Sequence, residues 1–321
     1  MKIISFKDIA DLNVQPLMCF DWAEAMIRSK KEALLPPKIS LKPYDGVFCN
    51  VMPSIIPGSD NTKWGGVKVV TRYPNRVPSL ESRILLMNAD SGEFVALMDG
   101  TWITTMRTGA VAAHSIMLLG KKDFATIGIM GLGNVSRSTL LILADKLRDR
   151  EFYVKLLRYK GQEEDFAKRF ASYKNLHFSF VDTAKEMVKG SDVVISGATY
   201  LPNDVCPDEY FDKGVLVQPI HTLGFTNCDL FFDKVFADDL GHVRLFKNFD
   251  KFKQFAEVCD VVNGNKPGRE NDDERILAYN IGVSVHDIYF AVAIYHMMQE
   301  RGILDSLNEI DMNDPTEKFW V

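Results

Sequence analysis

From Phe124 onward, short apolar runs alternate with longer amphipathic segments. Each run has the length of a buried strand, and most are followed by a turn and a segment with the apolar spacing of a helix. The runs are FATIGIM at 124–130, FYVKLLRY at 152–159, HFSFV at 177–181, DVVISGA at 192–198, GVLVQPI at 214–220 and KVFAD at 234–238. Strands that alternate with helices in this way predict βαβ units and a parallel, doubly wound sheet.

The residues on either side of this segment follow a different pattern. Between residues 36 and 104, short apolar runs are broken by Pro, Gly, Asn and Asp, which predicts an antiparallel or mixed sheet. Helical spacing and end signals predict helices over 21–35, 108–119 and 283–300. The predicted fold class is therefore α/β, with a Rossmann-type doubly wound parallel sheet inserted in a second α+β domain. The inserted domain is residues 121–282, and the second domain is residues 1–120 plus 283–321.

Composition narrows the class of protein without identifying a function. The 321 residues include 38 basic and 43 acidic side chains, for a net charge of −5, and no basic run supplies the footprint that nucleic-acid phosphates need. No apolar stretch approaches the roughly 18 residues that cross a bilayer, and the N-terminal sequence lacks the apolar core of a signal peptide. The five cysteines occur singly, which favours reduced thiols in a cytoplasmic protein. The six histidines show no metal-ligand spacing, so no metal site is predicted.

The first predicted strand–helix junction carries a glycine motif, Gly-Leu-Gly-Asn-Val-Ser at 131–136. Gly131 would allow the tight turn, Gly133 would let the backbone approach a pyrophosphate, and Ser136 would permit close packing of helix on strand. Free N–H groups at the start of the helix, at Asn134 and Val135, favour an anion there. An ordinary strand–helix turn is the alternative, but the βαβ context favours a dinucleotide site.

The end of the second predicted strand bears on the choice of cofactor. An acidic residue there bonds the ribose hydroxyls of NAD, whereas an arginine pairs with the 2′-phosphate of NADP. In this chain the acidic position is Leu157, followed by Arg158 and Lys160. The pattern favours NADP(H), with NAD(H) as the alternative cofactor. Two solvated charges at a strand end are the other interpretation of these residues.

Further motifs follow one another in a fixed order along nearly the whole chain. Met52-Pro53 precedes Gly66-Val67-Lys68, and MDGTWITTMRTGAV at 98–111 precedes the glycine motif. The pattern continues with GNKPGR at 264–269 and NIGVSVHD at 280–287. This arrangement resembles the ornithine cyclodeaminase/mu-crystallin family. The stretch at 267–274 is most similar to the branch with siderophore-pathway amino-acid dehydrogenases.

The resemblance implies a nicotinamide-dependent enzyme that acts on an L-amino acid, usually as a homodimer whose α+β domain binds the substrate and makes the dimer. By position, Lys68 matches the family's catalytic lysine and Arg107 the arginine that grips the substrate carboxylate. Lys38 matches a second carboxylate-binding cation, with Lys42 as a rival. The positions that match the cofactor side are Thr108, Ala198, Thr199, Ile281 and Gly282.

The residues themselves allow a plainer interpretation. Without the resemblance, Lys68 in an alternating strand would be a solvated side chain, and Arg107 at a helix start would be a structural ion-pair partner. With it, a lysine close to Arg107 and another cation should have a lowered pKa and act as an acid or base near neutral pH.

One loop departs from the cyclodeaminase pattern. The aspartate that cyclodeaminases carry after the fifth strand is replaced by Leu223, and a nearby lysine by Asn227. This argues against the cyclisation of ornithine but leaves hydride transfer intact. His221, two residues before Leu223, is a candidate substitute acid or base, with a structural histidine as the alternative.

The predicted function is hydride transfer between a nicotinamide and the Cα of an L-amino acid, or of a secondary, opine-type amino acid, through an imine. One alternative is an ornithine cyclodeaminase that forms L-proline and ammonia. The other is a mu-crystallin-like NADPH-binding protein or ketimine reductase.

Overall fold

The computed structural model describes residues 1–312 except 59–61, 200, 202, 221–230 and 247. It contains two compact units. The first comprises Met1–Val14, Glu32–Ile103 and Asp287–Val321, and the second comprises Gln15–Lys31 and Thr104–His286. The division differs from the expected boundaries because residues 15–31, 104–120 and 283–286 group with the inserted segment. One physical reason is that α2 (Pro16–Ser29) packs against two helices of the second unit, α4 (Asn134–Lys146) and α8 (Val258–Val262).

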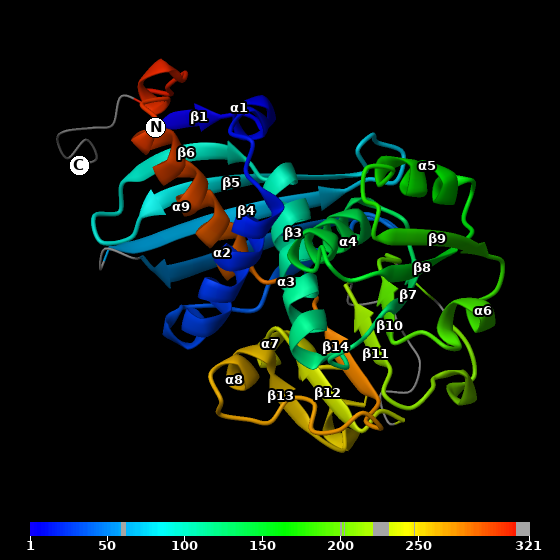
Figure 1. Ribbon diagram of the computed structural model, residues 1–321. Helices are drawn as coiled ribbons and strands as arrows, with labels where there is room; N and C mark the ends of the chain where they lie inside the picture. The colour runs from blue at the N-terminus through cyan, green and yellow to red at the C-terminus, as the bar shows by residue number, and fades with distance from the viewer. Residues whose placement is uncertain (59–61, 200, 202, 221–230, 247, 313–321) are drawn as a thin grey trace. The chain divides into compact units, whose positions relative to one another are not determined.

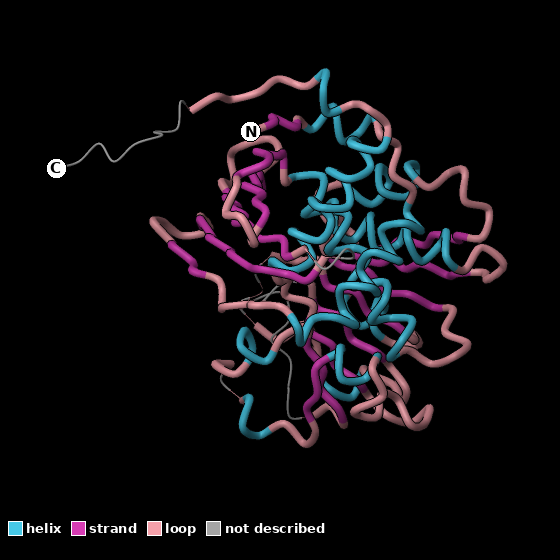
Figure 2. Tube along the Cα trace, turned by 90° about the vertical axis from the view of Figure 1, so that its left-hand side faces the viewer, coloured by secondary structure: helices cyan, strands magenta, loops and turns pink. Residues whose placement is uncertain are grey.

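The first unit is built on a six-stranded mixed sheet, whose long strands are drawn as magenta tubes in Figure 2. The strand order is β1-β6-β5-β4-β3-β2, and every neighbouring pair is antiparallel except β1 with β6. The bounds are β1 Lys2–Ile4, β2 Ile39–Leu41, β3 Phe48–Pro57, β4 Lys63–Arg72, β5 Leu80–Asn88 and β6 Phe94–Asp99. The short helices of this unit are α1 Phe6–Asp11 and a 3-10 turn at Leu304–Ser306.

Helix α9 (Ser284–Glu300) lies against the six-stranded sheet, where Figure 1 shows it beside β4, β5 and β6. Trp64, Gly66 and Lys68 point to one face of β4, because alternate residues of a strand share a face. On this face the Trp64 ring packs against the rings of Tyr295 and His296 of α9. At Gly66 a Cβ atom would lie 2.8 Å from Cδ1 of Ile288 and 2.4 Å from the carbonyl oxygen of Leu85. A side chain at this position would therefore clash with the β5 backbone at Leu85 and would crowd Ile288 in the first turns of α9.

Two expected helix starts were wrong. Helix α2 begins at Pro16 rather than Asp21, because proline suits the first helical position, and a 3-10 turn at Lys30–Glu32 follows it. Helix α3 (Thr101–Leu119) begins seven residues before the expected 108, since Asp99 accepts hydrogen bonds from the N–H groups of Thr101 and Trp102. Arg107 consequently lies inside a helix rather than at its start.

The second unit contains a parallel eight-stranded sheet in the order β13-β12-β14-β11-β10-β7-β8-β9, which confirms the doubly wound fold class (Figure 1). Its strands are β7 Thr126–Met130, β8 Phe152–Leu157, β9 Leu176–Val181, β10 Val193–Ser196, β11 Leu216–Pro219, β12 Lys234–Ala237, β13 Phe255–Glu257 and β14 Ile276–Tyr279. Its further helices are α4 Asn134–Lys146, α5 Gln162–Arg169, α6 Ala184–Val188, α7 Leu240–Val243 and α8 Val258–Val262. The strand order reverses between β7 and β10, and ligands of such sheets bind at the carboxyl ends of the strands at this point.

Among the described residues, no helix is both long enough and apolar enough to cross a membrane.

Candidate active site

The glycine motif forms the turn between β7 and α4. Gly131 has φ +74, and a Cβ atom there would lie 2.3 Å from the backbone nitrogen of Ala198. Ser136 donates a hydrogen bond of 2.6 Å to the carbonyl of Gly131, which ties the helix to the turn. A Cβ atom at Gly197 would lie 2.2 Å from Oγ of Ser136. The structure therefore brings the turns after β7 and β10 together at the carboxyl ends of their strands.

The same turn offers an anion site of the expected kind. Gly133 precedes α4 without a side-chain cap, and a Cβ atom there would meet nothing within 4 Å. Gly133 and Asn134 are exposed and Val135 is half-buried. Uncapped amides at the start of a thirteen-residue helix, beside open space, fit the pyrophosphate of a dinucleotide.

Arg158 lies at the end of β8 and is held by three groups. Its Nη1 is 3.2 Å from Oε1 of Glu163, its Nε is 3.2 Å from Oδ1 of Asp182, and its guanidinium lies over the Phe180 ring. Glu163 also accepts a 3.1 Å bond from the N–H of Tyr159, and hydrogen bonds from backbone N–H groups lower its pKa. Arg158 is thus fixed in place, and its positive charge is partly neutralised by two carboxylates. The ammonium of Lys160 lies over the Tyr159 ring.

Arg107 and Thr108 lie in the part of α3 that packs on α4. A Cβ atom at Gly109 would lie 2.2 Å from Oγ of Ser138, so glycine allows this close crossing. Thr108 is buried, and its Oγ1 donates a 2.6 Å hydrogen bond to the carbonyl of Thr104.

The Arg107 guanidinium packs against Gly282. Arg107 is 4% exposed, and a Cβ atom at Gly282 would lie 2.5 Å from its Nη1. Gly282 has φ +79, and its N–H donates a 2.8 Å bond to Oδ2 of the buried Asp238. Burial raises the pKa of Asp238, and burial followed by the charge of Arg107 lowers the pKa of His286 well below its ordinary value. Two of the predicted residues, Arg107 and Gly282, are therefore in direct contact.

Lys68 is in the middle of β4 and is 1% exposed. Its Nζ lies 2.6 Å from Oδ2 of Asp287, a fully buried residue in the first turn of α9. The plainer interpretation, in which Lys68 is a solvated side chain, is therefore wrong. Lys68 and Arg107 belong to different units, so the lowered pKa expected of Lys68 stays a prediction.

The strand register relates Lys38 to Lys68. Ile39 pairs with Val51, and Met52 pairs with Lys68. Lys38 directly precedes β2, so it continues the row of Met52 and Lys68 at two strand spacings, roughly 10 Å, from Lys68. Lys42 directly follows β2, four residues after Lys38, and so continues the row of Phe48 and Arg72. The register favours Lys38 over Lys42 as the cation of the Lys68 row.

For three predicted residues, His221, Thr199 and Ile281, the structure gives a location or burial at most. His221 lies outside the described residues, as do Leu223 and Asn227, so the role predicted for His221 stays a prediction. Thr199 is exposed directly after the Gly197–Ala198 turn, and Ile281 is buried beside Gly282.

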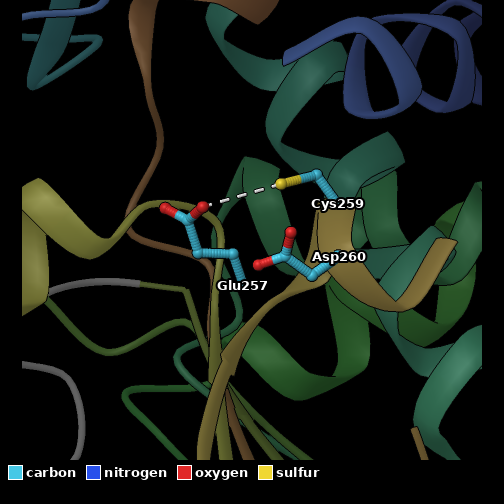
Figure 3. A group of neighbouring side chains, drawn as sticks. All are labelled: Glu257, Cys259 and Asp260. Atoms are coloured by element: carbon cyan, nitrogen blue, oxygen red, sulfur yellow. Dashed lines mark hydrogen bonds between the residues drawn. The ribbon is translucent and has the colours of Figure 1, made fainter. Parts of the chain in front are cut away.

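A group of three potential metal ligands, Glu257, Cys259 and Asp260, lies at the end of β13 and the start of α8 (Figure 3). Their ligand atoms lie within 4.8 Å of one another. Glu257 is paired with the ammonium groups of Lys30 and Lys31, and burial raises the pKa of Cys259 to about 11. Because the carboxylate is neutralised and the thiol is protonated, the group fits an ion-pair cluster better than a metal centre.

Within its own unit, each of three acidic residues lies beside a predicted site residue and was not itself predicted as a site residue. They are Asp287 at Lys68, Asp238 at the Gly282 turn, and Glu163 at Arg158. Asp287 stands in the NIGVSVHD motif that supported the resemblance, so the motif could have pointed to it. Asp238 ends the apolar run KVFAD, at the strand end where site residues gather.

Comparison with known proteins agrees with the motif order. A model of the ornithine cyclodeaminase/mu-crystallin family matches residues 5–302. N-((2S)-2-amino-2-carboxyethyl)-L-glutamate dehydrogenase of Staphylococcus aureus is 26% identical over 295 residues, covering 85% of this chain and 87% of that protein. Delta(1)-pyrroline-2-carboxylate reductase of Bacillus cereus is 27% identical over 279 residues, covering 79% and 82%.

A solved structure has the same fold. Thermococcus litoralis Delta(1)-pyrroline-2-carboxylate reductase, in complex with NADH and L-proline, matches with a TM-score of 0.83 and 23% identity. The match covers 97% of this chain and 100% of that chain, so it includes both units described above.

Proposed function

The chain belongs to the ornithine cyclodeaminase/mu-crystallin family, and on this premise we propose that it is a nicotinamide-dependent oxidoreductase of amino acids. The proposed reaction is the reduction of an imine to an L-amino acid or to a secondary, opine-type amino acid, and the reverse oxidation. The names of the two relatives, an aminocarboxyethyl-glutamate dehydrogenase and a pyrroline-2-carboxylate reductase, support this class of reaction.

The burial of Lys68 is the observation that carries the proposal. A lysine is almost never fully buried unless it is paired, because removing an ammonium from water is costly, and Lys68 has such a partner in Asp287. Lys68 is 1% exposed at the motif position of the family's catalytic lysine. Its amine is therefore assigned to proton transfer at the substrate nitrogen.

Each of the other residues has a binding role. Arg107 presents a planar guanidinium, which suits a bidentate contact with the substrate carboxylate, and Lys38 adds a second positive charge. The glycine turn and the start of α4 would hold the pyrophosphate of the dinucleotide. When bound, the reduced nicotinamide supplies the hydride that converts the imine carbon to an sp³ centre.

We propose NADP(H) as the preferred cofactor because Arg158 occupies the strand end that faces the adenosine ribose in this fold. Glu163, Asp182 and Phe180 fix its guanidinium, while the side chain stays 45% exposed. The negative charges of the two carboxylates repel a phosphate, so the preference for NADP(H) over NAD(H) is expected to be moderate.

We also include a homodimer in the proposal. Apolar Ile39 and Leu41, 59% and 57% exposed on the edge strand β2, support a protein partner there.

The Arg158→Ala variant is expected to bind NADPH about tenfold more weakly while NADH binding changes little, since a lost charge-assisted contact is worth about 1.5–3 kcal/mol and exposure reduces it. Titration of nicotinamide fluorescence measures both dissociation constants. Arg148→Ala, which removes a surface cation paired with Asp145, is the matched control. Equal losses for the two cofactors would refute the assignment of Arg158 to the 2′-phosphate.

A substrate screen tests the proposed reaction. L-amino acids, cyclic imines and ketoacid–amine pairs are assayed with NADH and NADPH, following the near-ultraviolet absorbance of the reduced cofactor. Stoichiometric oxidation or formation of NAD(P)H supports the proposal. Conversion of ornithine to proline and ammonia without a net change in reduced cofactor would make the protein a cyclodeaminase. Tight NADPH binding without any turnover would make it a mu-crystallin-like binding protein.

A further inference from the structure

We infer that Asp287 is a positioning residue that fixes the amine of Lys68 and keeps it in the charged form that donates a proton. This inference rests on the role proposed for Lys68. It concerns the protonation state of the Lys68 amine before the substrate binds and the residue of this chain that maintains that state.

The geometry of the pair is that of a desolvated ion pair. The Nζ–Oδ2 distance is 2.6 Å, and the side chains of Lys68 and Asp287 are 1% and 0% exposed. At such a site bulk water contributes little to the solvation of the ammonium, so an adjacent carboxylate strongly favours the charged form. A neutral partner of the same shape would not.

The groups packed around Lys68 make Asp287 its anionic partner. The cross-strand neighbours in the register, Met52 on β3 and Ile84 on β5, are buried and uncharged. The next residues on the same face of β4, Gly66 and Val70, are also uncharged.

Along the chain, His286 precedes Asp287. Burial is the main cause that holds the pKa of His286 well below its ordinary value, so this imidazole is neutral near pH 7. Asp287 therefore supplies the negative charge that α9 presents to the amine.

Two features hold the carboxylate in place. Asp287 is in the first turn of α9, where the helix dipole stabilises a negative charge. Ile288, the next residue of α9, packs over Gly66 of β4, where a Cβ atom would lie 2.8 Å from its Cδ1. The position of the amine is thus determined by a strand, a helix and the glycine between them.

The chemical consequence is a reusable proton donor. In imine reduction a C–H bond forms with the hydride from the reduced cofactor, and the electron pair of the C=N π bond moves to nitrogen. The nitrogen takes a proton from the Lys68 ammonium, so one N–H bond breaks and another forms. The neutral amine left beside Asp287 then regains a proton from water.

The test compares the pH profiles of imine reduction for the wild type and Asp287→Asn, with Glu300→Gln as the control. Glu300 is an exposed acidic residue in the last turn of the same helix. We expect the alkaline limb of kcat to move to lower pH by at least about one unit in Asp287→Asn, which is a tenfold loss of activity per unit on that limb. The Glu300→Gln profile should overlay that of the wild type. A purely structural role for Asp287 would lower activity by the same factor at every pH and would overturn the inference.

A measurement on the wild type covers the case in which Asp287→Asn does not fold. The Cε resonance of isotope-labelled Lys68, assigned by its absence from Lys68→Arg, should have the shift of a charged amine up to the alkaline limb of wild-type activity. A neutral amine at the pH of maximal reduction would contradict the inference.

The substrate screen tests the proposed function independently of this inference, because the proposed function is refuted if no imine or amino acid is turned over. The resonance still reports the charge of Lys68 in that case. A charged amine at neutral pH then supports the pairing with Asp287, and a neutral one refutes it.

Discussion

Replacing Lys68 with methionine is expected to lower kcat for imine reduction by about 10²–10⁴-fold, the usual range for loss of a positioned acid or base. Methionine has a similar length but carries no proton to donate. The dissociation constant of the cofactor should change little, because the glycine turn and Arg158 belong to the other unit. Single-turnover reduction and nicotinamide fluorescence measure the two quantities.

The interpretation of this variant needs two controls. Lys63→Met removes an exposed lysine from the same strand and should keep wild-type rates. Lys68→Met also leaves Asp287 buried without its cation, and breaking a buried pair costs about 3–5 kcal/mol of stability. The double variant Lys68→Met/Asp287→Leu removes both charges, so it should recover most of the lost thermal stability while remaining inactive. A rate within tenfold of the wild type in Lys68→Met would exclude Lys68 as the proton donor.

Replacing Arg107 with alanine is expected to raise KM for the amino-acid substrate by roughly 30- to 4000-fold, because removing one partner of a buried, hydrogen-bonded charge pair costs about 2–5 kcal/mol. Arg107→Lys keeps the charge but loses the planar fork, so it should recover only part of this binding. Initial rates at saturating cofactor measure both effects.

A substrate analogue separates loss of carboxylate binding from general damage to the site. The wild type should reduce an imine acid much better than the corresponding imine amide, which has no negative charge. Arg107→Ala should lose most of that discrimination, while the KM for the cofactor stays close to that of the wild type. If the variant still discriminates as well as the wild type, another cation binds the carboxylate.

The features that local patterns encode were predictable from the sequence. The parallel sheet follows from short apolar runs that alternate with helical segments, and the glycine turn follows from Gly131 and Gly133. The starts of α2 and α3 were misplaced because the residues that define them, Pro16 and Asp99, lie outside the apolar pattern. Strand β14 was not predicted, since it contributes only Ile276–Tyr279 and pairs between β11 and β12, out of chain order.

The charges around the site were less predictable because they depend on contacts between distant segments. Glu163 lies in the first turn of α5 and accepts bonds from Arg158 and Tyr159 at the end of β8, a contact that no local pattern indicates. No pattern in the sequence linked Lys68 with Asp287. The pair depends on the packing of α9 against β4, and a sequence does not show which helix packs on a given strand.

The first unit also has a consequence for the order of folding. This unit joins the two ends of the chain, since Ile3 donates a backbone bond to Asn308 and Lys2 forms an ion pair with Glu309. The helix that carries Asp287 is made after the whole of the second unit. Contacts this far apart in sequence form late, because a long loop must close before they can contribute. During synthesis the second unit can therefore complete its sheet before α9, which the first unit needs, has been made. A nascent chain that stops before this helix should be able to assemble the nucleotide-binding sheet but not the buried pair needed for proton transfer.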